Sequence, residues 1–311
     1  WTDGAEVDVA GAMEALAQRN ILETLLGPAA DGSLDRLAAA SRNRKRAFER
    51  HFVSLFPVPQ LLPSQANRDY LRATRLLRAA VDEEIAARRS AGRRPDDMLS
   101  LLMETTFDDG TAMSDREVRE EVMMLTLTGY DSVNEALQWT LCLLAQHPEA
   151  DAALAAEALA GAQTAYATSA IRESLRLFPP TWMVVRCALG EDRLPSGATI
   201  PAGAKAYLCP YVVQRNPAYW PEPDRFLPAR FADGAANGRP RYAYFPFGGG
   251  PHVCIGEMLA MAQIVAVLRT LARRWQLSLP DGVVVVPDGG LTLRPRGGLR
   301  MRAELRESAP L

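Results

Sequence analysis

The chain has 311 residues, a formal net charge of −2, 48% hydrophobic residues and 23% charged residues. This composition is typical of a soluble globular protein with a large core, and the near-neutral charge gives no reason to expect a nucleic-acid partner. No apolar run approaches the ~20 residues that a membrane helix needs, and the N-terminus does not resemble a signal peptide. The cysteines are widely spaced, which suggests neither a zinc site nor a disulfide framework and favours a reducing, cytoplasmic setting. They are Cys142, Cys187, Cys209 and Cys254.

Apolar residues recur at helical spacing through the first half of the chain. Ser114 is followed three residues later by Glu117, and this capping box predicts that a long helix begins at residue 115. Helices are predicted, in chain order, over 5–27, 33–54, 65–90, 96–105, 115–146, 150–160 and 168–177.

The centre of the 115–146 helix carries an unusual group of polar residues and a glycine. Glycine in a helix interior costs about 1 kcal/mol relative to alanine, and serine or threonine can bend a helix by bonding back to its carbonyls. One interpretation is a helix that opens locally beside a ligand, and the other is a polar, solvent-facing stretch of a core helix. The residues concerned are Thr126, Thr128, Gly129, Tyr130, Asp131, Ser132 and Asn134.

Glu173 and Arg176 lie three residues apart in the predicted 168–177 helix. At this spacing they share one face and can form a charge-assisted pair. A surface pair would contribute little to stability, but the apolar residues around these two favour a buried pair. Pro179-Pro180 then ends the helix.

From Thr181 onward the pattern changes to short strands separated by turns that contain proline and glycine. Strands are predicted over 183–187, 198–200, 204–209, 283–286, 291–293 and 299–305, with helices over 212–216 and 255–275. The sequence therefore predicts a mainly α fold with a small β-rich subdomain. We expect a single domain, 1–311, that is helix-rich over 1–180 and mixed over 181–311.

Residues 247–256 read Phe-Gly-Gly-Gly-Pro-His-Val-Cys-Ile-Gly, and they predict a tight loop that becomes a helix at Cys254. The start of a helix favours negative charge, so it would stabilise the Cys254 thiolate. A thiolate on a fixed loop suits a metal ligand. The alternative is a small buried cysteine beside a glycine-rich turn.

Four segments together resemble motifs of the cytochrome P-450 family, the haem-thiolate monooxygenases. Residues 128–132 are similar to the oxygen-activation segment of the family's long central helix, and 173–176 to its Glu-x-x-Arg motif. Residues 228–231 are similar to its Pro-x-Arg-Phe motif, and 247–256 to its haem loop. Each motif alone is weak, but four of them in the family's order are specific.

The resemblance implies haem b as the cofactor and implies the residues that hold it. Cys254 would be the axial thiolate ligand of the iron, and His252 and Arg186 would bind the haem propionates. Asp131 and Ser132 match the acid–alcohol pair that delivers protons. The other cofactor-binding positions are Phe247, Gly248, Gly256 and Gly129. The buried structural network would comprise Glu173, Arg176 and Arg230.

The resemblance covers essentially the whole chain, but the family's N-terminal quarter has no counterpart in it. The alcohol of the acid–alcohol pair is Ser132, where threonine is usual. Positions that face substrate in the family are mostly apolar here, which implies a hydrophobic substrate of natural-product, terpenoid or fatty-acyl type; the alternative for each position is plain core packing. They are Leu125, Thr128, Tyr130, Trp182, Met183, Val184, Leu291 and Thr292.

The implied function is insertion of one oxygen atom from O2 into such a substrate. Electrons would come from a separate donor such as a ferredoxin and its reductase, because no flavin or iron–sulfur segment is recognised. Two alternatives stay open. One is a haem-thiolate enzyme that performs oxidative coupling or peroxide-driven oxidation, and the other is a degenerate homologue that acts as a partner subunit. Neither a nucleic acid nor a membrane is an expected partner.

Overall fold

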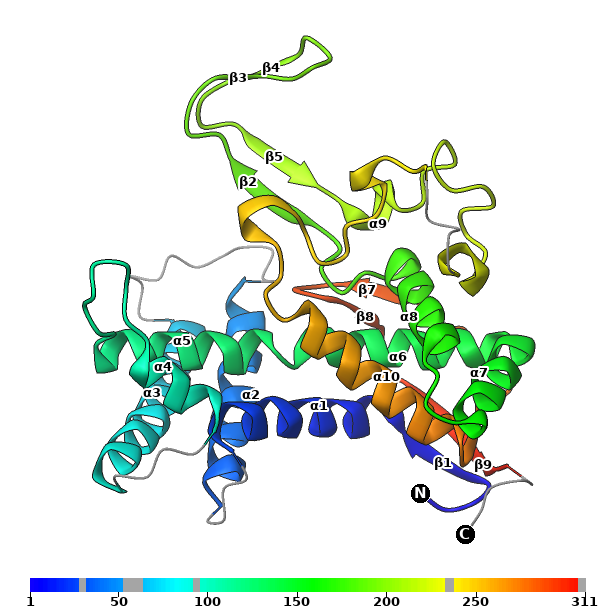
Figure 1. The fold of residues 1–311 in the computed structure, drawn as a ribbon, viewed down its shortest axis with the longest axis horizontal. Helices are drawn as coiled ribbons and strands as arrows, with labels where there is room; N and C mark the ends of the chain where they lie inside the picture. The colour runs from blue at the N-terminus through cyan, green and yellow to red at the C-terminus, as the bar shows by residue number, and fades with distance from the viewer. Residues whose placement is uncertain (28–31, 53–63, 92–95, 233–237, 307–311) are drawn as a thin grey trace. The chain divides into compact units, whose positions relative to one another are not determined.

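The computed structural model describes residues 1–27, 32–52, 64–91, 96–232 and 238–306 (Figure 1). The chain divides into two compact units. The helical unit is Gly11–Asn134, and the main unit is Trp1–Ala10 together with Glu135–Leu311. The division falls between residues 10 and 11 and between residues 134 and 135. Within the described ranges, no helix is long and apolar enough to cross a membrane.

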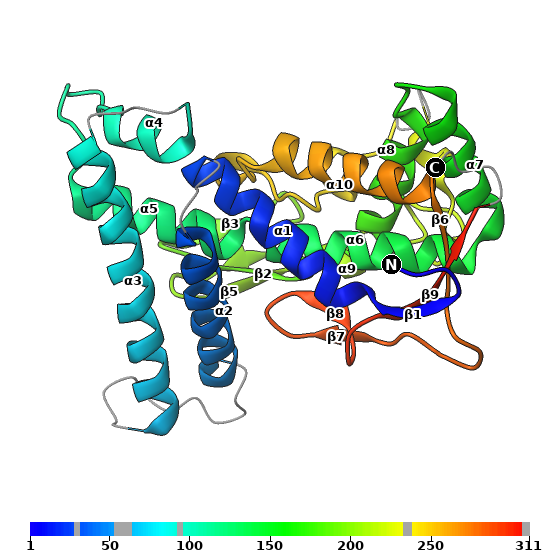
Figure 2. The same cartoon turned by 90° about the horizontal axis from the view of Figure 1, so that it is seen from below.

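The helical unit is built from long helices that pack along one another. They are most of α1 (Val9–Leu26), α2 (Ser33–Phe52), α3 (Gln65–Ala91), α4 (Met98–Glu104), α5 (Asp115–Thr128) and the first residues of α6 (Asp131–Gln146). Helix α3 packs on both α2 and α5, and Figure 2 shows α2 and α3 side by side. Leu77, Val81 and Ile85 recur every four residues along α3 and are at most 2% exposed, which is the apolar stripe that such packing needs.

Polar contacts fix the helix ends of this unit. Ser114 and Glu117 form the predicted capping box, in which the Ser114 amide donates to the Glu117 carboxylate at 2.8 Å. The Arg88 guanidinium donates to the Asp97 carboxylate at 2.6 Å and to the Leu26 carbonyl at 3.1 Å. A single half-buried side chain, Arg88, therefore joins the ends of α1, α3 and α4.

The main unit combines helices with a three-stranded antiparallel sheet. Its helices are the rest of α6, α7 (Pro148–Ala160), α8 (Ala165–Leu177) and α10 (Glu257–Ala272), and α10 packs on both α7 and α8. The sheet has the order β1 (Ala5–Asp8), β9 (Arg300–Leu305), β6 (Trp275–Ser278) (Figure 2). Val7 pairs with Met301, and Leu277 pairs with Ala303, so that buried side chains alternate along the strands.

Among the described residues, three short hairpins and several single turns of helix complete the main unit. The hairpins pair β2 (Val184–Cys187) with β5 (Lys205–Leu208), β3 (Asp192–Arg193) with β4 (Thr199–Ile200), and β7 (Pro287–Gly289) with β8 (Leu293–Pro295). In Figure 1 the β2–β5 ribbon leaves the end of α8, and β3–β4 continues it at the far tip. The short helices are α9 (Pro210–Val213) and the 3₁₀ turns η1 (Pro228–Phe231), η2 (Arg241–Ala243) and η3 (Gly250–His252).

Trp139 of α6 anchors the core of the main unit. Its ring stacks on Phe178 with centroids 3.9 Å apart, and its indole nitrogen donates to the Leu293 carbonyl at 2.9 Å. A buried tryptophan needs such an acceptor. The contact fixes the C-terminal end of α8 and the strand β8 against α6.

The mainly α fold with small sheets is as predicted, but some elements differ. Residues 5–8 form strand β1 instead of the first turn of a helix, because they pair with β9 from the other end of the chain. The predicted 115–146 helix is interrupted at Gly129-Tyr130, so that α5 and α6 are separate helices. Residues 53 and 54 of the predicted second helix lie outside the described ranges.

Two differences concern the C-terminal part. The apolar run 283–286 is not a strand, since Val284 is 82% exposed, and the adjacent Pro287–Gly289 pairs instead. The helix after the cysteine loop was predicted over 255–275 and spans Glu257–Ala272. Trp275, predicted to end that helix, begins strand β6.

Candidate active site

Residues 247–256 form a closed loop held by its own backbone. The Cys254 amide donates to the Phe247 carbonyl at 2.9 Å. Gly248 and Gly250 have φ of +77° and +68°, which side chains with a Cβ rarely adopt. Gly249 is extended, but a Cβ there would lie 2.6 Å from the Tyr242 ring. The glycines are therefore required by backbone conformation and by close packing, as the sequence predicted.

The helix was predicted to begin at Cys254, but Cys254 lies in irregular backbone just before a turn at Ile255-Gly256, and α10 begins only at Glu257. Its thiol is exposed, which rules out the buried-cysteine alternative. Ile255 and Met258 beside it are 84% and 86% exposed. A Cβ on Gly256 would lie 3.9 Å from the Cys254 sulfur. An exposed thiol among exposed apolar side chains fits a large, flat, apolar group whose metal takes a sulfur ligand.

Two predicted propionate-binding side chains lie in the main unit with Cys254. His252 is exposed on η3, and Arg186 is exposed on β2. The Arg186 guanidinium donates to the carbonyl of Val185 at 3.0 Å, and the group is otherwise open to solvent. Both side chains can therefore reach an anionic group from the surface.

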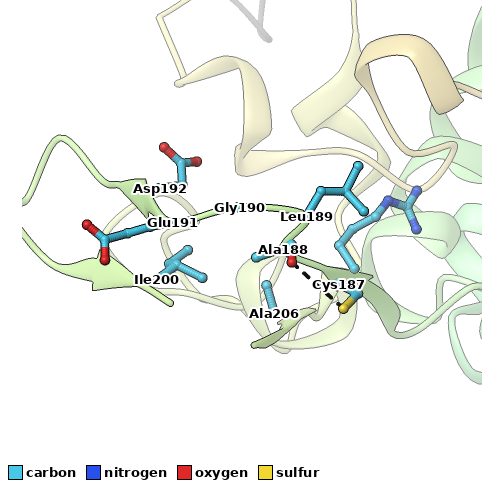
Figure 3. A pocket seen from close by; sticks show the side chains of 9 residues that line it. Cys187, Ala188, Leu189, Gly190, Glu191, Asp192, Ile200 and Ala206 are labelled. Atoms are coloured by element: carbon cyan, nitrogen blue, oxygen red, sulfur yellow. Dashed lines mark hydrogen bonds between the residues drawn. The ribbon is translucent and has the colours of Figure 1, made fainter. Parts of the chain in front are cut away.

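A hollow of about 360 Å³ opens beside Arg186 (Figure 3). Cys187 lies at one end of it, and Glu191 and Asp192 lie at the other. Two carboxylates disfavour a second anion in the same place. The acidic end of the hollow therefore does not favour a propionate, whereas Arg186 lines the hollow with a positive charge.

Glu173, Arg176 and Arg230 are in contact in the interior of the main unit. The Arg176 guanidinium donates two hydrogen bonds to the Glu173 carboxylate, at 2.7 and 2.8 Å, and both side chains are fully buried. Arg230 donates to the same carboxylate at 3.2 Å. Two cations around one carboxylate leave one positive charge in excess, which needs further acceptors.

Backbone carbonyls supply these acceptors. Arg176 donates to the carbonyls of Gln214, Pro223 and Arg225 at 2.6 to 3.1 Å. The Leu227 amide donates to Glu173 at 3.0 Å. The network therefore fixes the irregular segment 214–231 on α8. The sequence contained no signal for Gln214, since its contacts are with residues far along the chain.

In the helical unit, Asp131 forms a short ion pair with Lys45 of α2. Lys45 also lies 3.7 Å from Glu14 and 5.5 Å from the centroid of the Tyr130 ring. Burial raises the pKa of the Asp131 carboxyl, and the Lys45 ammonium only partly opposes the shift. Burial also lowers the pKa of Lys45, but the carboxylates of Asp131 and Glu14 outweigh it and leave that pKa raised.

Lys45 was not among the predicted site residues. Its helix reads as a basic, solvated face, and Asp131 is 86 residues away. The pairing has a chemical consequence. An acid whose pKa lies above its usual range keeps its proton to higher pH than an ordinary aspartate does.

Close packing and side-chain hydrogen bonds accompany the break between α5 and α6. The Gly129 amide donates to the Leu125 carbonyl at 2.9 Å. A Cβ on Gly129 would lie 2.7 Å from this carbonyl oxygen and 2.7 Å from the Ile21 side chain. Thr128 bonds back to the Met124 carbonyl at 2.9 Å, which bends helices. Ser132, directly after the break, is half-buried.

The predicted pocket residues of the helical unit differ in exposure. Thr128 is exposed and Leu125 is half-buried. Tyr130 is fully buried, and burial raises the pKa of its hydroxyl. Its ring lies beneath the Lys45 ammonium, so the structure places Tyr130 against α2.

The predicted pocket residues of the main unit lie around Trp182. The Trp182 indole donates to the Gly290 carbonyl at 3.1 Å, which brings it to the turn that carries Leu291 and Thr292. Met183 is 37% exposed and Leu291 is 50% exposed. Val184 and Thr292 are half-buried. This hydrogen bond thus places the segment that carries Trp182, Met183 and Val184 next to the turn that carries Leu291 and Thr292.

Comparisons with known proteins match this arrangement to one family. The family model "Cytochrome P450" matches residues 4–299. Cyclooctat-9-en-7-ol 5-monooxygenase of Streptomyces melanosporofaciens is 32% identical over 92% of this chain and 65% of that protein. Cyclooctatin synthase of the same organism is 34% identical over 79% of this chain and 56% of that protein. The chain thus spans less than two thirds of the length of these relatives.

Comparisons with solved structures identify the same family. The crystal structure of the cytochrome P450DA heme domain has a TM-score of 0.88 and 25% identity, over 98% of this chain and 70% of that one. The retinoic acid-bound cyanobacterial CYP120A1 has a TM-score of 0.85 and 23% identity, over 98% of this chain and 71% of that one, and it shows likeness of fold alone. The chain belongs to the cytochrome P450 family.

Proposed function

We propose that the protein is a haem-thiolate monooxygenase that inserts one oxygen atom from O2 into a hydrophobic small molecule. The observation that carries the proposal is the exposed Cys254 thiol on a closed glycine loop, with the exposed side chains of Ile255 and Met258 beside it. A cysteine-ligated haem is the cofactor of the family, and we propose that this chain takes haem b.

When bound, the haem supplies the activation of dioxygen that oxygen insertion requires. The chain's own residues would hold and orient it. Cys254 would ligate the iron, and the side chains of His252 and Arg186 would bind the propionates. Phe247, Gly248 and Gly256 would leave a flat surface, because the glycines carry no side chain toward the group.

Asp131 and Ser132 would supply protons. A hydroxyl can accept one proton and donate another, so Ser132 can pass on a proton that Asp131 provides. The raised pKa of Asp131 favours this role, because its protonated form persists closer to neutral pH. Gly129, at the break before them, would allow the helix to open beside the haem.

The substrate would be apolar and of natural-product, terpenoid or fatty-acyl type. The apolar surface of Trp182, Met183 and Leu291 supports this class. So do the printed names of two relatives, a cyclooctat-9-en-7-ol 5-monooxygenase and a cyclooctatin synthase. We propose that electrons come from a separate partner such as a ferredoxin with its reductase.

The test is the carbon monoxide difference spectrum of the reduced, haem-loaded protein. We expect the long-wavelength Soret band of a thiolate-ligated haem, and we expect Cys254→Ser to abolish it. Cys187→Ser is the matched control, because Cys187 is also an exposed cysteine of the main unit. Absence of bound haem, or loss of the band in the control alone, would overturn the proposal. Isotope-labelled dioxygen then separates oxygen insertion from oxidative coupling, since only insertion places the label in the product.

A further inference from the structure

Two backbone carbonyls at the end of α8 lack the donors that a continuing helix would supply. In an α-helix the carbonyl of each residue accepts from the amide four positions later. Four positions after Leu175 and Arg176 stand Pro179 and Pro180, and proline has no N–H group. Both carbonyls therefore depend on donors from elsewhere in the chain.

Gln214, directly after α9, supplies both donors. Its side-chain nitrogen donates to the Leu175 carbonyl at 3.0 Å and to the Arg176 carbonyl at 3.1 Å. A primary amide nitrogen carries two N–H groups, so it can satisfy two acceptors. Gln214 is fully buried, where an unpaired carbonyl would be costly.

The other end of the same side chain holds the cysteine loop. The Gln214 side-chain oxygen accepts from the Phe245 amide at 2.8 Å. The Phe245 carbonyl accepts from Gly248 at 3.0 Å, and the Phe247 carbonyl accepts from the Cys254 amide at 2.9 Å. A continuous series of hydrogen bonds thus runs from the end of α8 through Gln214 to the loop of Cys254.

No other side chain of this length offers the same set of groups. Glutamate keeps the acceptor but loses both donors, and leucine keeps only the shape. Asparagine has the amide but is shorter by one methylene. The backbone carbonyl of Gln214 also accepts from Arg176 at 2.9 Å, so the residue itself is fixed by the buried ion pair.

We propose that Gln214 is a positioning residue for the Cys254 thiolate. Its side-chain amide holds the start of the cysteine loop against the end of α8 and thereby fixes the position of the Cys254 sulfur. The effect on ligation rests on the proposed function, because it requires that Cys254 bind haem iron.

The first measurement is the carbon monoxide spectrum of the reduced, haem-loaded variants Gln214→Leu and Gln214→Glu. We expect most of the thiolate band to be replaced by the shorter-wavelength band of haem without a thiolate ligand. Gln138→Leu is the matched control, because Gln138 is a buried glutamine of α6 in the same unit. We expect it to lower the melting temperature but to keep the thiolate band.

The second measurement is amide hydrogen exchange in the full chain without haem. We expect the Phe245 and Cys254 amides to exchange at least about tenfold faster in the Gln214 variants, the effect of losing roughly one hydrogen bond. Gln214→Asn, expected to show a smaller increase, decides the matter if the other variants do not fold. If both amides of the Gln214 variants exchanged at the wild-type rate, the proposal would be overturned, whatever the melting temperature of the variants.

The two measurements separate this proposal from the proposed function. If the wild-type protein shows no thiolate band, the proposed function fails, and the exchange rates still decide whether Gln214 holds the loop. If the wild type shows the band and the Gln214 variants retain it, the proposed function stands and the positioning role of Gln214 is wrong.

Discussion

Glutamate precedes arginine by three residues in two ion pairs of the main unit, Glu173–Arg176 and Glu222–Arg225. The spacing and the residue types are the same, but the first pair is fully buried and the side chains of the second are 56% and 63% exposed. Breaking a buried pair leaves a charge without a partner in the interior, whereas solvent replaces an exposed partner. The two pairs therefore isolate the effect of burial.

We expect Arg176→Met to lower the free energy of unfolding by at least about 3 kcal/mol, because it leaves the Glu173 carboxylate buried beside a more distant Arg230. We expect Arg225→Met to change it by less than about 1 kcal/mol. Urea unfolding followed by tryptophan fluorescence measures both. Equal losses in the two variants would contradict the conclusion that the buried Glu173–Arg176 pair fixes the segment 214–231 on α8.

Lys45 determines how far the Asp131 carboxyl departs from its usual pKa. Burial raises this pKa in the folded state, so the folded protein holds the proton more tightly than the unfolded chain does. The contribution of Asp131 to the free energy of unfolding therefore falls as pH rises through the folded-state pKa. Lys45 lowers this pKa, so Lys45→Met should raise it further and extend the loss to higher pH.

We expect Lys45→Met to lower the free energy of unfolding by about 3 kcal/mol at neutral pH, and by less at an acidic pH at which Asp131 takes up a proton. Arg46→Met is the control, since it removes a neighbouring but exposed cation of the same helix. Urea unfolding at both pH values and carboxyl carbon NMR of Asp131 measure the two effects. A pKa of Asp131 that is unchanged in Lys45→Met would show that the ion pair does not set it.

At the scale of the elements, hydrophobic periodicity predicted the helices. It did not predict elements whose structure depends on contacts with residues far away in the sequence. Strand β1 has apolar residues whose spacing suits a helix equally well, and only pairing with β9 makes it a strand. The run 283–286 has high strand propensity, but Val284 is 82% exposed and has no partner strand among the described residues. Propensity is a weak guide wherever a strand needs a partner from far along the chain.

The interruption between α5 and α6 was foreseen as one of two interpretations, because glycine and back-bonding hydroxyls weaken a helix locally. Its cause could not be read from the sequence. Gly129 is needed because the Ile21 side chain and the Leu125 carbonyl leave no space for a Cβ. Ile21 is far away in the sequence, so no pattern of neighbouring residues reports this contact.

At the scale of the whole molecule, the sequence motifs identified the family. They did not predict the residues that hold the motif residues in place. Motif residues such as Cys254 and Glu173 are recognised from their local sequence. Lys45 and Gln214 act through partners 86 and 31 residues away. Contacts at such separations come from the tertiary fold, which a reading of local sequence does not contain.

The four cysteines report on the main unit as a whole, because together they range from exposed to buried. Cys187 and Cys254 are exposed, Cys209 is half-buried with its thiol 3.1 Å from the Trp182 carbonyl, and Cys142 is buried. Burial raises the pKa of Cys142 to about 12, so its reactive thiolate is scarce near neutral pH. We expect a thiol reagent to modify Cys187 and Cys254 first, Cys209 more slowly and Cys142 last, as measured by peptide mass spectrometry.

Addition of haem should then protect one of the two fast cysteines and not the other. Protection of Cys254 with unchanged labelling of Cys187 is expected, because only the Cys254 sulfur would become an iron ligand. Equal protection of both would indicate non-specific coverage of the apolar surface. Rapid labelling of Cys142 before haem is added would mean that the core around α6 opens in solution, since a buried thiol reacts only when its surroundings separate.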